Sequence, residues 1–190
     1  MNITVYLGAL RGNDPVLRDA VKELGTWIRE NNHTLIYGES KSGLMGYIAE
    51  SVLDAGGDVI GIEPQFFIDE ELQYDGLTEL IITKDMTERK TKMIELGDAF
   101  IAFPGGTGTL EEISEVMSKI SLKQLNAPCI FYNLNDYYRG YERTYVPYDR
   151  NGIINSWETE GYLFCGSSRR YKKYYWEGIV IFIIIPFIME

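Results

Sequence analysis

A glycine-rich stretch in the middle of the chain has the composition of a phosphate-binding turn. The residues after Phe103 read Pro104-Gly105-Gly106-Thr107-Gly108-Thr109. Residues without a Cβ let the backbone come close to a phosphate, and the N–H groups at the start of a helix attract its negative charge. A tight strand-to-helix turn without a ligand would use the same glycines, so the stretch alone leaves both interpretations open.

Glu112 follows the glycine-rich stretch and also has two interpretations. The run Thr109-Leu110-Glu111-Glu112 matches a capping box, in which the third residue after the cap folds back onto the helix start. A carboxylate beside a bound ribose would instead stabilise the positive charge that develops at the anomeric carbon when a glycosidic bond breaks. The motif itself does not separate the two roles.

Two neighbouring cations, Arg89 and Lys90, lie upstream in a segment with helical character. Such a pair is usually part of a solvated helix face. The chain as a whole is acidic, however, with 28 acidic and 18 basic residues and a net charge of −10. A guanidinium binds phosphate oxygens bidentately, so the pair is a candidate phosphate clamp. The negative field repels DNA, RNA and anionic membranes, so we expect no nucleic acid polymer and no membrane as a partner.

Short aliphatic runs alternate with longer amphipathic stretches, and this alternation predicts the elements that position these residues. Strands are expected at 3–7, 34–37, 59–62, 80–82, 99–103 and 129–132, and helices at 15–31, 43–56, 86–96 and 109–122. This order is typical of βαβ units. The sequence therefore predicts an α/β fold, a Rossmann-like doubly wound parallel sheet in three α/β/α layers, with ligands beyond the carboxyl ends of the strands.

The remaining composition narrows the class of protein. Cys129 and Cys165 suggest neither a disulfide framework nor a clustered metal site, and no signal peptide is evident, so we expect a cytoplasmic protein. The apolar run 179–189 is about half the length needed to span a bilayer. His33 is expected to face solvent at a turn. Segment 63–75 mixes aromatic and acidic residues and is expected to be an active-site or interface loop.

Arg89-Lys90 followed by the run 104–112 resembles the paired signature of the Lonely Guy family, which is often mislabelled as lysine decarboxylase. The resemblance covers residues 3–138 and includes the run 35–46. It implies a phosphoribohydrolase, usually a homodimer, that hydrolyses the N-glycosidic bond of a purine nucleoside 5′-monophosphate. The substrate would be AMP or an N6-substituted AMP, and the products the free base and ribose 5-phosphate. No metal or organic cofactor is implied.

The resemblance also assigns residue roles. Arg89 and Glu112 would be the catalytic pair. The substrate-binding residues would be Lys90, Gly105, Gly106, Gly108, Thr109, Gly43 and Met45. Two departures from the family pattern bear on the nucleotide contacts: Glu39-Ser40 interrupts a glycine run, and Gly8-Ala9 stands where many members carry Gly-Ser.

Two other functions compete with hydrolysis as interpretations of the sequence. A nucleotide-binding sensor or carrier module without turnover is the alternative, because a fold and a phosphate loop alone do not establish turnover. Lysine decarboxylation would need a lysine that holds pyridoxal phosphate in a much larger framework, and the sequence supplies no such context.

The C-terminal part of the chain does not follow the family pattern. We expect a nucleotide-binding catalytic domain at 1–138 and an atypical segment at 139–190. Pro147 and clustered aromatic residues spoil the expected helix. Reading residues 142–154 one base later permits a peptide with the missing helical period. A frameshift near Arg139 is therefore our hypothesis for this segment.

Overall fold

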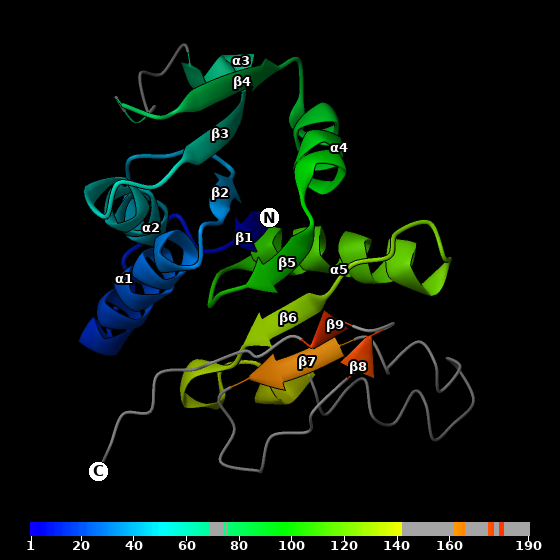
Figure 1. Cartoon of the computed structure of the whole chain (residues 1–190). Helices are drawn as coiled ribbons and strands as arrows, with labels where there is room; N and C mark the ends of the chain where they lie inside the picture. The colour runs from blue at the N-terminus through cyan, green and yellow to red at the C-terminus, as the bar shows by residue number, and fades with distance from the viewer. Residues whose placement is uncertain (69–73, 75, 142–161, 166–174, 177–178, 181–190) are drawn as a thin grey trace.

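A parallel β-sheet organises the protein, as the computed structural model shows for residues 1–68, 74, 76–141, 162–165, 175–176 and 179–180 (Figure 1). Within these residues the sheet has seven strands in the order β4-β3-β2-β1-β5-β6-β7. The strands are β1 (Asn2–Tyr6), β2 (Thr34–Tyr37), β3 (Val59–Pro64), β4 (Glu79–Thr83), β5 (Ala99–Ala102), β6 (Cys129–Tyr132) and β7 (Tyr162–Cys165). All neighbouring strands of this sheet pair in parallel. A separate antiparallel pair joins β8 (Tyr175–Trp176) and β9 (Ile179–Val180).

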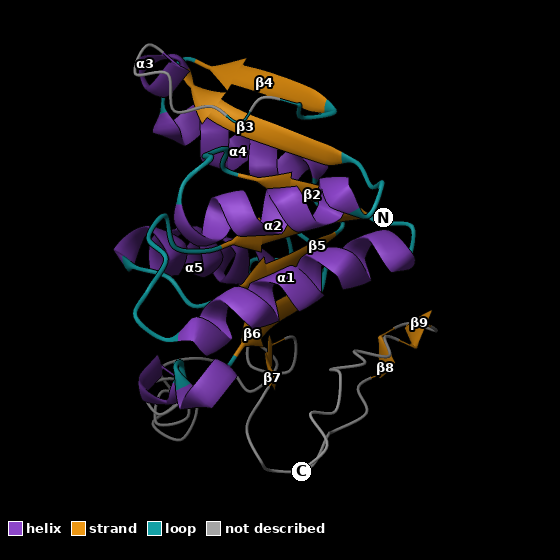
Figure 2. Cartoon of the chain, turned by 90° about the vertical axis from the view of Figure 1, so that its left-hand side faces the viewer, coloured by secondary structure: helices purple, strands orange, loops and turns teal. Residues whose placement is uncertain are grey.

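Helices cover both faces of the sheet (Figure 2). They are α1 (Pro15–Glu30), α2 (Gly43–Asp54), α3 (Gln65–Ile68), α4 (Met86–Leu96) and α5 (Thr107–Ser121), with a short 3-10 helix η1 (Leu134–Asp136) after β6. α1 and α2 share one apolar core with one side of the strands, and α4 and α5 share a second core with the other side. The predicted Rossmann-like, doubly wound, three-layer fold is confirmed.

Local sequence signals explain where the first helix begins. Asp14 caps α1, because its Oδ1 accepts a hydrogen bond of 3.0 Å from the Val16 N–H. Pro15 occupies the first turn, where a missing N–H has no consequence for the helical hydrogen bonds. The helix then buries one stripe, which includes Val21 and Ile28, against the sheet. An amphipathic helix is stabilised mainly by this burial.

The sheet changes winding direction between β1 and β5. From β1 the chain continues through β2 and β3 to β4 on one side, whereas β5 leads to β6 and β7 on the other. The loops that leave β1 and β5 meet at this point, where the Gly8 N–H donates to the Pro104 carbonyl at 3.3 Å. In doubly wound sheets the crevice at such a switch point is the usual ligand site.

The structure also bears on the C-terminal segment. β7 pairs with β6 through Tyr162 and the residues that follow it, so the sheet extends past residue 138, where the predicted domain ends. The family pattern has a helix at the place of residues 142–154. These residues and most of the apolar run 179–189 lie outside the described residues. Among the helices that the structure describes, none is long and apolar enough to cross a membrane.

Candidate active site

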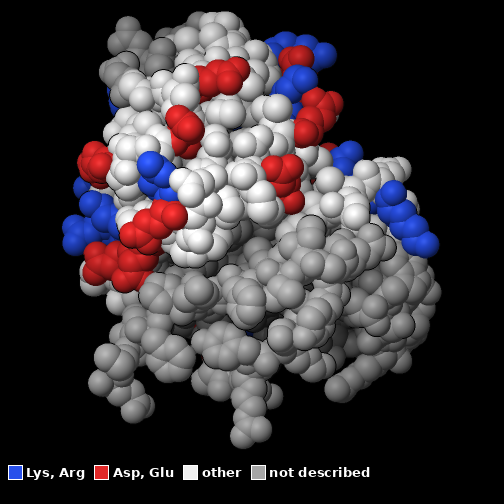
Figure 3. Space-filling model, in the orientation of Figure 1, with Lys and Arg blue, Asp and Glu red and all other residues white. Residues whose placement is uncertain are grey.

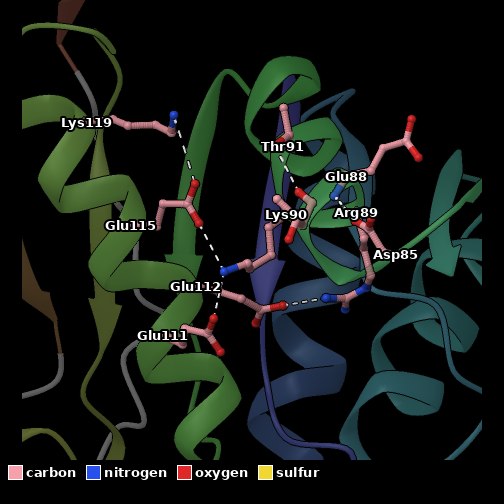
Figure 4. A network of polar contacts seen from close by, with 10 residues as sticks. Asp85, Glu88, Arg89, Lys90, Thr91, Glu111, Glu112, Glu115 and Lys119 are labelled. Atoms are coloured by element: carbon pink, nitrogen blue, oxygen red, sulfur yellow. Dashed lines mark hydrogen bonds and ion pairs between the residues drawn. The ribbon is translucent and has the colours of Figure 1, made fainter.

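Arg89 is a buried cation at the centre of the candidate site (Figure 4). It lies in the first turn of α4, which Asp85 caps by accepting the Glu88 N–H at 2.9 Å. Only 5% of Arg89 is exposed. Its Nε donates to the Ile62 carbonyl at 3.1 Å, and its Nη1 donates to Glu112 Oε1 at 2.7 Å. These two bonds fix the plane of the guanidinium between β3 and α5.

Gly38 makes room for this guanidinium. An ideal Cβ built on Gly38 would lie 1.3 Å from Arg89 Nη2 and 2.4 Å from Cζ. No side chain fits in that space while Arg89 keeps its position. The glycine directly after β2 is therefore required by the close approach of a side chain from α4, a reason that the sequence alone did not reveal.

Glu112 faces Arg89 and does not cap a helix. α5 begins at Thr107 with Gly106 as its N-cap, two residues earlier than predicted, so the capping-box interpretation of Glu112 is wrong. The Glu112 side chain is 11% exposed. Burial raises the pKa of its carboxyl, and the adjacent Arg89 guanidinium offsets part of that rise. The result is a buried, hydrogen-bonded ion pair that joins α4 to α5.

The glycine-rich turn has one closed side and one open side. An ideal Cβ on Gly105 would lie 2.1 Å from Thr109 Oγ1 and 2.9 Å from the Gly8 nitrogen, so this glycine is tightly packed. An ideal Cβ on Gly106 or Gly108 would meet no atom within 4 Å. The Thr109 side chain is buried, and its backbone N–H belongs to the first turn of α5, where helical N–H groups lack carbonyl partners within the helix. The turn thus presents N–H groups beside open space.

The start of α2 lies against the same region. Gly43 has a φ of +62°, and an ideal Cβ there would lie 2.1 Å from the Ala9 carbonyl oxygen. Ala9 follows Gly8, which contacts the glycine-rich turn. The first turn of α2, which carries Gly43 and Met45, is therefore joined to the turn through the loop after β1. Of the residues proposed from the sequence, the structure pairs Arg89 with Glu112 and packs Gly105 against Thr109.

Comparison with known proteins identifies the family. The sequence model of a family described as "Possible lysine decarboxylase" matches residues 45–167. The cytokinin riboside 5′-monophosphate phosphoribohydrolase of Rhodococcoides fascians is 43% identical over 139 residues, which are 73% of this chain and 70% of that protein. The chain belongs to the Lonely Guy family.

Further relatives give the extent of the match. The probable cytokinin riboside 5′-monophosphate phosphoribohydrolase LOG4 of Oryza sativa subsp. japonica is 39% identical over 136 residues, 72% of this Lonely Guy chain and 59% of the rice protein. Arabidopsis thaliana LOG1 is also 39% identical over 136 residues, and the chain spans 64% of it.

Solved structures confirm the fold. The molybdenum cofactor binding protein of Rippkaea orientalis matches with a TM-score of 0.66 at 20% identity, covering 87% of this chain and 89% of that one. The molybdenum cofactor carrier protein of Chlamydomonas reinhardtii matches with a TM-score of 0.62 at 16% identity, covering 86% and 88%. At these identities the likeness is one of fold.

Lys90, the second cation of the Lonely Guy signature, contacts two carboxylates on α5. Its Nζ lies 2.7 Å from Glu111 Oε1 and 3.3 Å from Glu115 Oε2 (Figure 4). The hydrogen bond to Glu111 is the main reason why the pKa of Lys90 is raised. Arg89 and Lys90 therefore bond to different carboxylates, and Lys90 lies over the more exposed side of α5.

Two further carboxylates, Glu39 and Glu63, are buried, and both influence the ionisation of this region, although the sequence assigns neither a catalytic or binding role. Glu39, the departure from the Lonely Guy glycine run, is 2% exposed and accepts a hydrogen bond from the Tyr74 N–H. Glu63 was expected in a loop but belongs to the end of β3, and it is 5% exposed. Burial raises the pKa of Glu63 to about 8, although Arg89 lowers it, and Glu39 raises it further.

The raised pKa of Glu63 predicts that stability falls as the pH rises. The folded protein retains a proton on Glu63 that the unfolded chain releases near its ordinary pKa of 4.5. The resulting stabilisation is complete below that value and is lost as the pH rises through about 8. Urea unfolding at about pH 6 and about pH 9 should show the decrease. Glu63→Gln should flatten the slope, whereas Glu79→Gln, at an exposed position of β4, should not. Equal slopes for wild type and Glu63→Gln would contradict the prediction.

Within the described residues, no group of three or more His, Cys, Asp or Glu side chains is arranged to hold a metal ion.

Proposed function

We propose that this chain hydrolyses the N-glycosidic bond of a purine nucleoside 5′-monophosphate, with adenine or an N6-substituted adenine as the base. The products are the free base and ribose 5-phosphate. The buried Arg89–Glu112 pair carries the proposal, because Glu112 stands on α5, the helix that the glycine-rich turn opens, and Arg89 reaches it from α4. The phosphoribohydrolase names of the relatives support the reaction class.

We infer from helix geometry that a ribose phosphate would reach from the turn to Glu112. The phosphate binds at the N–H groups of Gly106, Thr107 and Gly108, where the positive end of the α5 dipole also stabilises its charge. Glu112 lies four residues after Gly108, which is about 6 Å along a helix. A phosphate at the turn therefore places the ribose beside Glu112 and Arg89.

The reaction breaks the bond between C1′ and the base nitrogen. The electron pair leaves with the base, which takes up a proton, and positive charge develops on the ribose ring. The Glu112 carboxylate stabilises this charge, while Arg89 orients the phosphate-bearing ribose. Water attacks C1′ and loses a proton. The raised pKa of Glu112 suits it to accept that proton.

The remaining substrate contacts and partners are part of the proposal. Lys90, Gly43, Met45 and Thr109 contact the nucleotide together with the glycine-rich turn, and the protein acts as a cytoplasmic homodimer without a cofactor. Figure 3 shows basic side chains interspersed with acidic ones on one face. A continuous basic stripe is the usual footprint of a nucleic-acid-binding protein, so this mixture favours a small substrate over a polymer.

Release of free base tests the proposal. Wild-type protein is incubated with AMP and with an N6-prenylated AMP, and the base and ribose 5-phosphate are quantified by chromatography. We expect equimolar products from at least one nucleotide and loss of turnover in Arg89→Ala and Glu112→Ala at equal folded concentration. Tight AMP binding without base release would instead support the alternative, a nucleotide sensor or carrier module.

A further inference from the structure

The segment 133–138, which follows β6, holds the backbone of the glycine-rich turn. The Tyr137 hydroxyl donates to the Gly105 carbonyl at 2.6 Å, and the Tyr138 hydroxyl donates to the Phe103 carbonyl at 2.7 Å. Two consecutive tyrosines thus bind carbonyl groups on either side of Pro104. Both are far from the turn in the sequence, and neither belongs to the two motifs that identify the family.

The segment is itself held in shape by several contacts. Asn133 Oδ1 accepts the Tyr138 N–H at 2.6 Å, and Asn135 Nδ2 donates to Asp14 Oδ2 at 3.1 Å. Asn135 and Asp136 have φ angles of +50° and +60°, a left-handed conformation that Asn and Asp tolerate better than most residues. The segment therefore connects the cap of α1 to the glycine-rich turn and places the Tyr137 hydroxyl at a defined point.

The Gly105–Gly106 peptide is the group that this hydroxyl controls. A glycine on each side leaves the peptide plane free to rotate more than any other pair of residues would. In a trans peptide the C=O and the N–H point in opposite directions. With the Gly105 oxygen bonded to Tyr137, the Gly106 N–H points away from Tyr137. The opposite orientation would present a carbonyl oxygen to a bound phosphate and repel it.

We propose that Tyr137 is a positioning residue for phosphate recognition: it binds the Gly105 carbonyl and so keeps the Gly106 N–H directed at the 5′-phosphate. This inference rests on the proposed function, because it assumes that the turn holds the phosphate of the substrate. Tyr137 does not touch the reacting atoms. Because Tyr137 acts on the part of the site that binds the phosphate, its loss should raise KM and weaken binding of the nucleotide. The value of kcat should change little.

Tyr137→Phe tests the proposal with the loss of a single oxygen atom. The variant keeps the ring, which packs edge-on against Tyr138 with centroids 5.1 Å apart. We expect AMP and ribose 5-phosphate to bind about fivefold more weakly, the usual effect of one neutral hydrogen bond. Adenosine, which lacks the phosphate, should bind as it does to wild type. Calorimetry measures the three affinities, and base release gives KM and kcat.

Tyr141→Phe is the matched control. It removes a hydroxyl that lies 3.0 Å from Ser114 Oγ on α5, away from the turn. This variant should leave the ratio of AMP affinity to adenosine affinity unchanged. Unaltered AMP affinity in Tyr137→Phe, or an equal loss of affinity for AMP and adenosine, would overturn the proposed role of Tyr137. Either result would leave the proposed function standing. If wild type binds AMP no more tightly than adenosine, the phosphate site itself is wrong, and the proposed function falls with it.

Discussion

Glu112→Gln should lower kcat for base release by about 10²- to 10³-fold while KM for AMP changes little. Glutamine has nearly the same shape and still offers an oxygen to Arg89 Nη1, now 2.7 Å from the carboxylate. It lacks the negative charge that would stabilise the developing positive charge on the ribose ring. Glutamine is preferred to alanine because removing one partner of a buried ion pair costs about 3–5 kcal/mol of stability. Base release at equal folded concentration measures the effect.

Glu111→Gln is the control for this change. Glu111 precedes Glu112 on the same helix, but its side chain is 66% exposed and contacts Lys90. The Glu111→Gln change removes the same charge from α5 but leaves the buried Arg89–Glu112 pair in place. Because exposed ion pairs contribute little free energy, kcat should stay within about twofold of wild type. A Glu112→Gln variant with wild-type kcat would show that Glu112 has only a structural role.

Most of the fold could be predicted from hydrophobic periodicity, because α1, α2, α5 and the central strands each bury a regular set of apolar side chains. The predicted strands at 34–37 and 129–132 have the observed bounds, and Asp14 and Pro15 located the start of α1. The periodicity failed where burial is irregular. α3 is four residues long, with no buried residue, and therefore has no periodic signal. Similarly, the sequence predicts that β3 ends at residue 62, because charged residues such as Glu63 are rarely buried, whereas the structure buries Glu63 within the strand.

From the residues alone the site could be predicted only as two separate motifs, and it is the resemblance to the family that predicts Arg89 and Glu112 as a pair. Arg89 and Glu112 stand 23 residues apart, and their ion pair depends on α4 and α5 lying side by side in one layer. No pattern in the sequence gives that adjacency. Gly38 and Tyr137 were missed for the same reason, since each acts through a distant partner that only the packed sheet brings near. Their roles are evident only from the contacts of Gly38 with Arg89 and of Tyr137 with Gly105 in the structure.

Gly38→Ala should abolish most of the activity although neither Arg89 nor Glu112 is changed. The added methyl would lie 1.3 Å from Arg89 Nη2, so the guanidinium must leave its position between β3 and α5. The clash involves the far end of a flexible side chain, so the fold should survive. We expect kcat to fall by about 10²-fold, the effect of losing one preorganised charge beside the reacting centre. Base release from AMP measures kcat, and circular dichroism checks the fold.

A double variant separates this explanation from general damage. If Gly38→Ala acts by displacing Arg89, then adding it to Arg89→Ala should lower kcat no further, because residues that share one interaction have non-additive effects. Gly140→Ala is the steric control, since an ideal Cβ there meets no atom within 4 Å. It should retain wild-type kcat. An additive loss in the double variant would show that Gly38 supports the site in another way, through the backbone after β2. A non-additive loss of kcat would mean that the rate of base release depends on the position of the Arg89 guanidinium as well as on its presence.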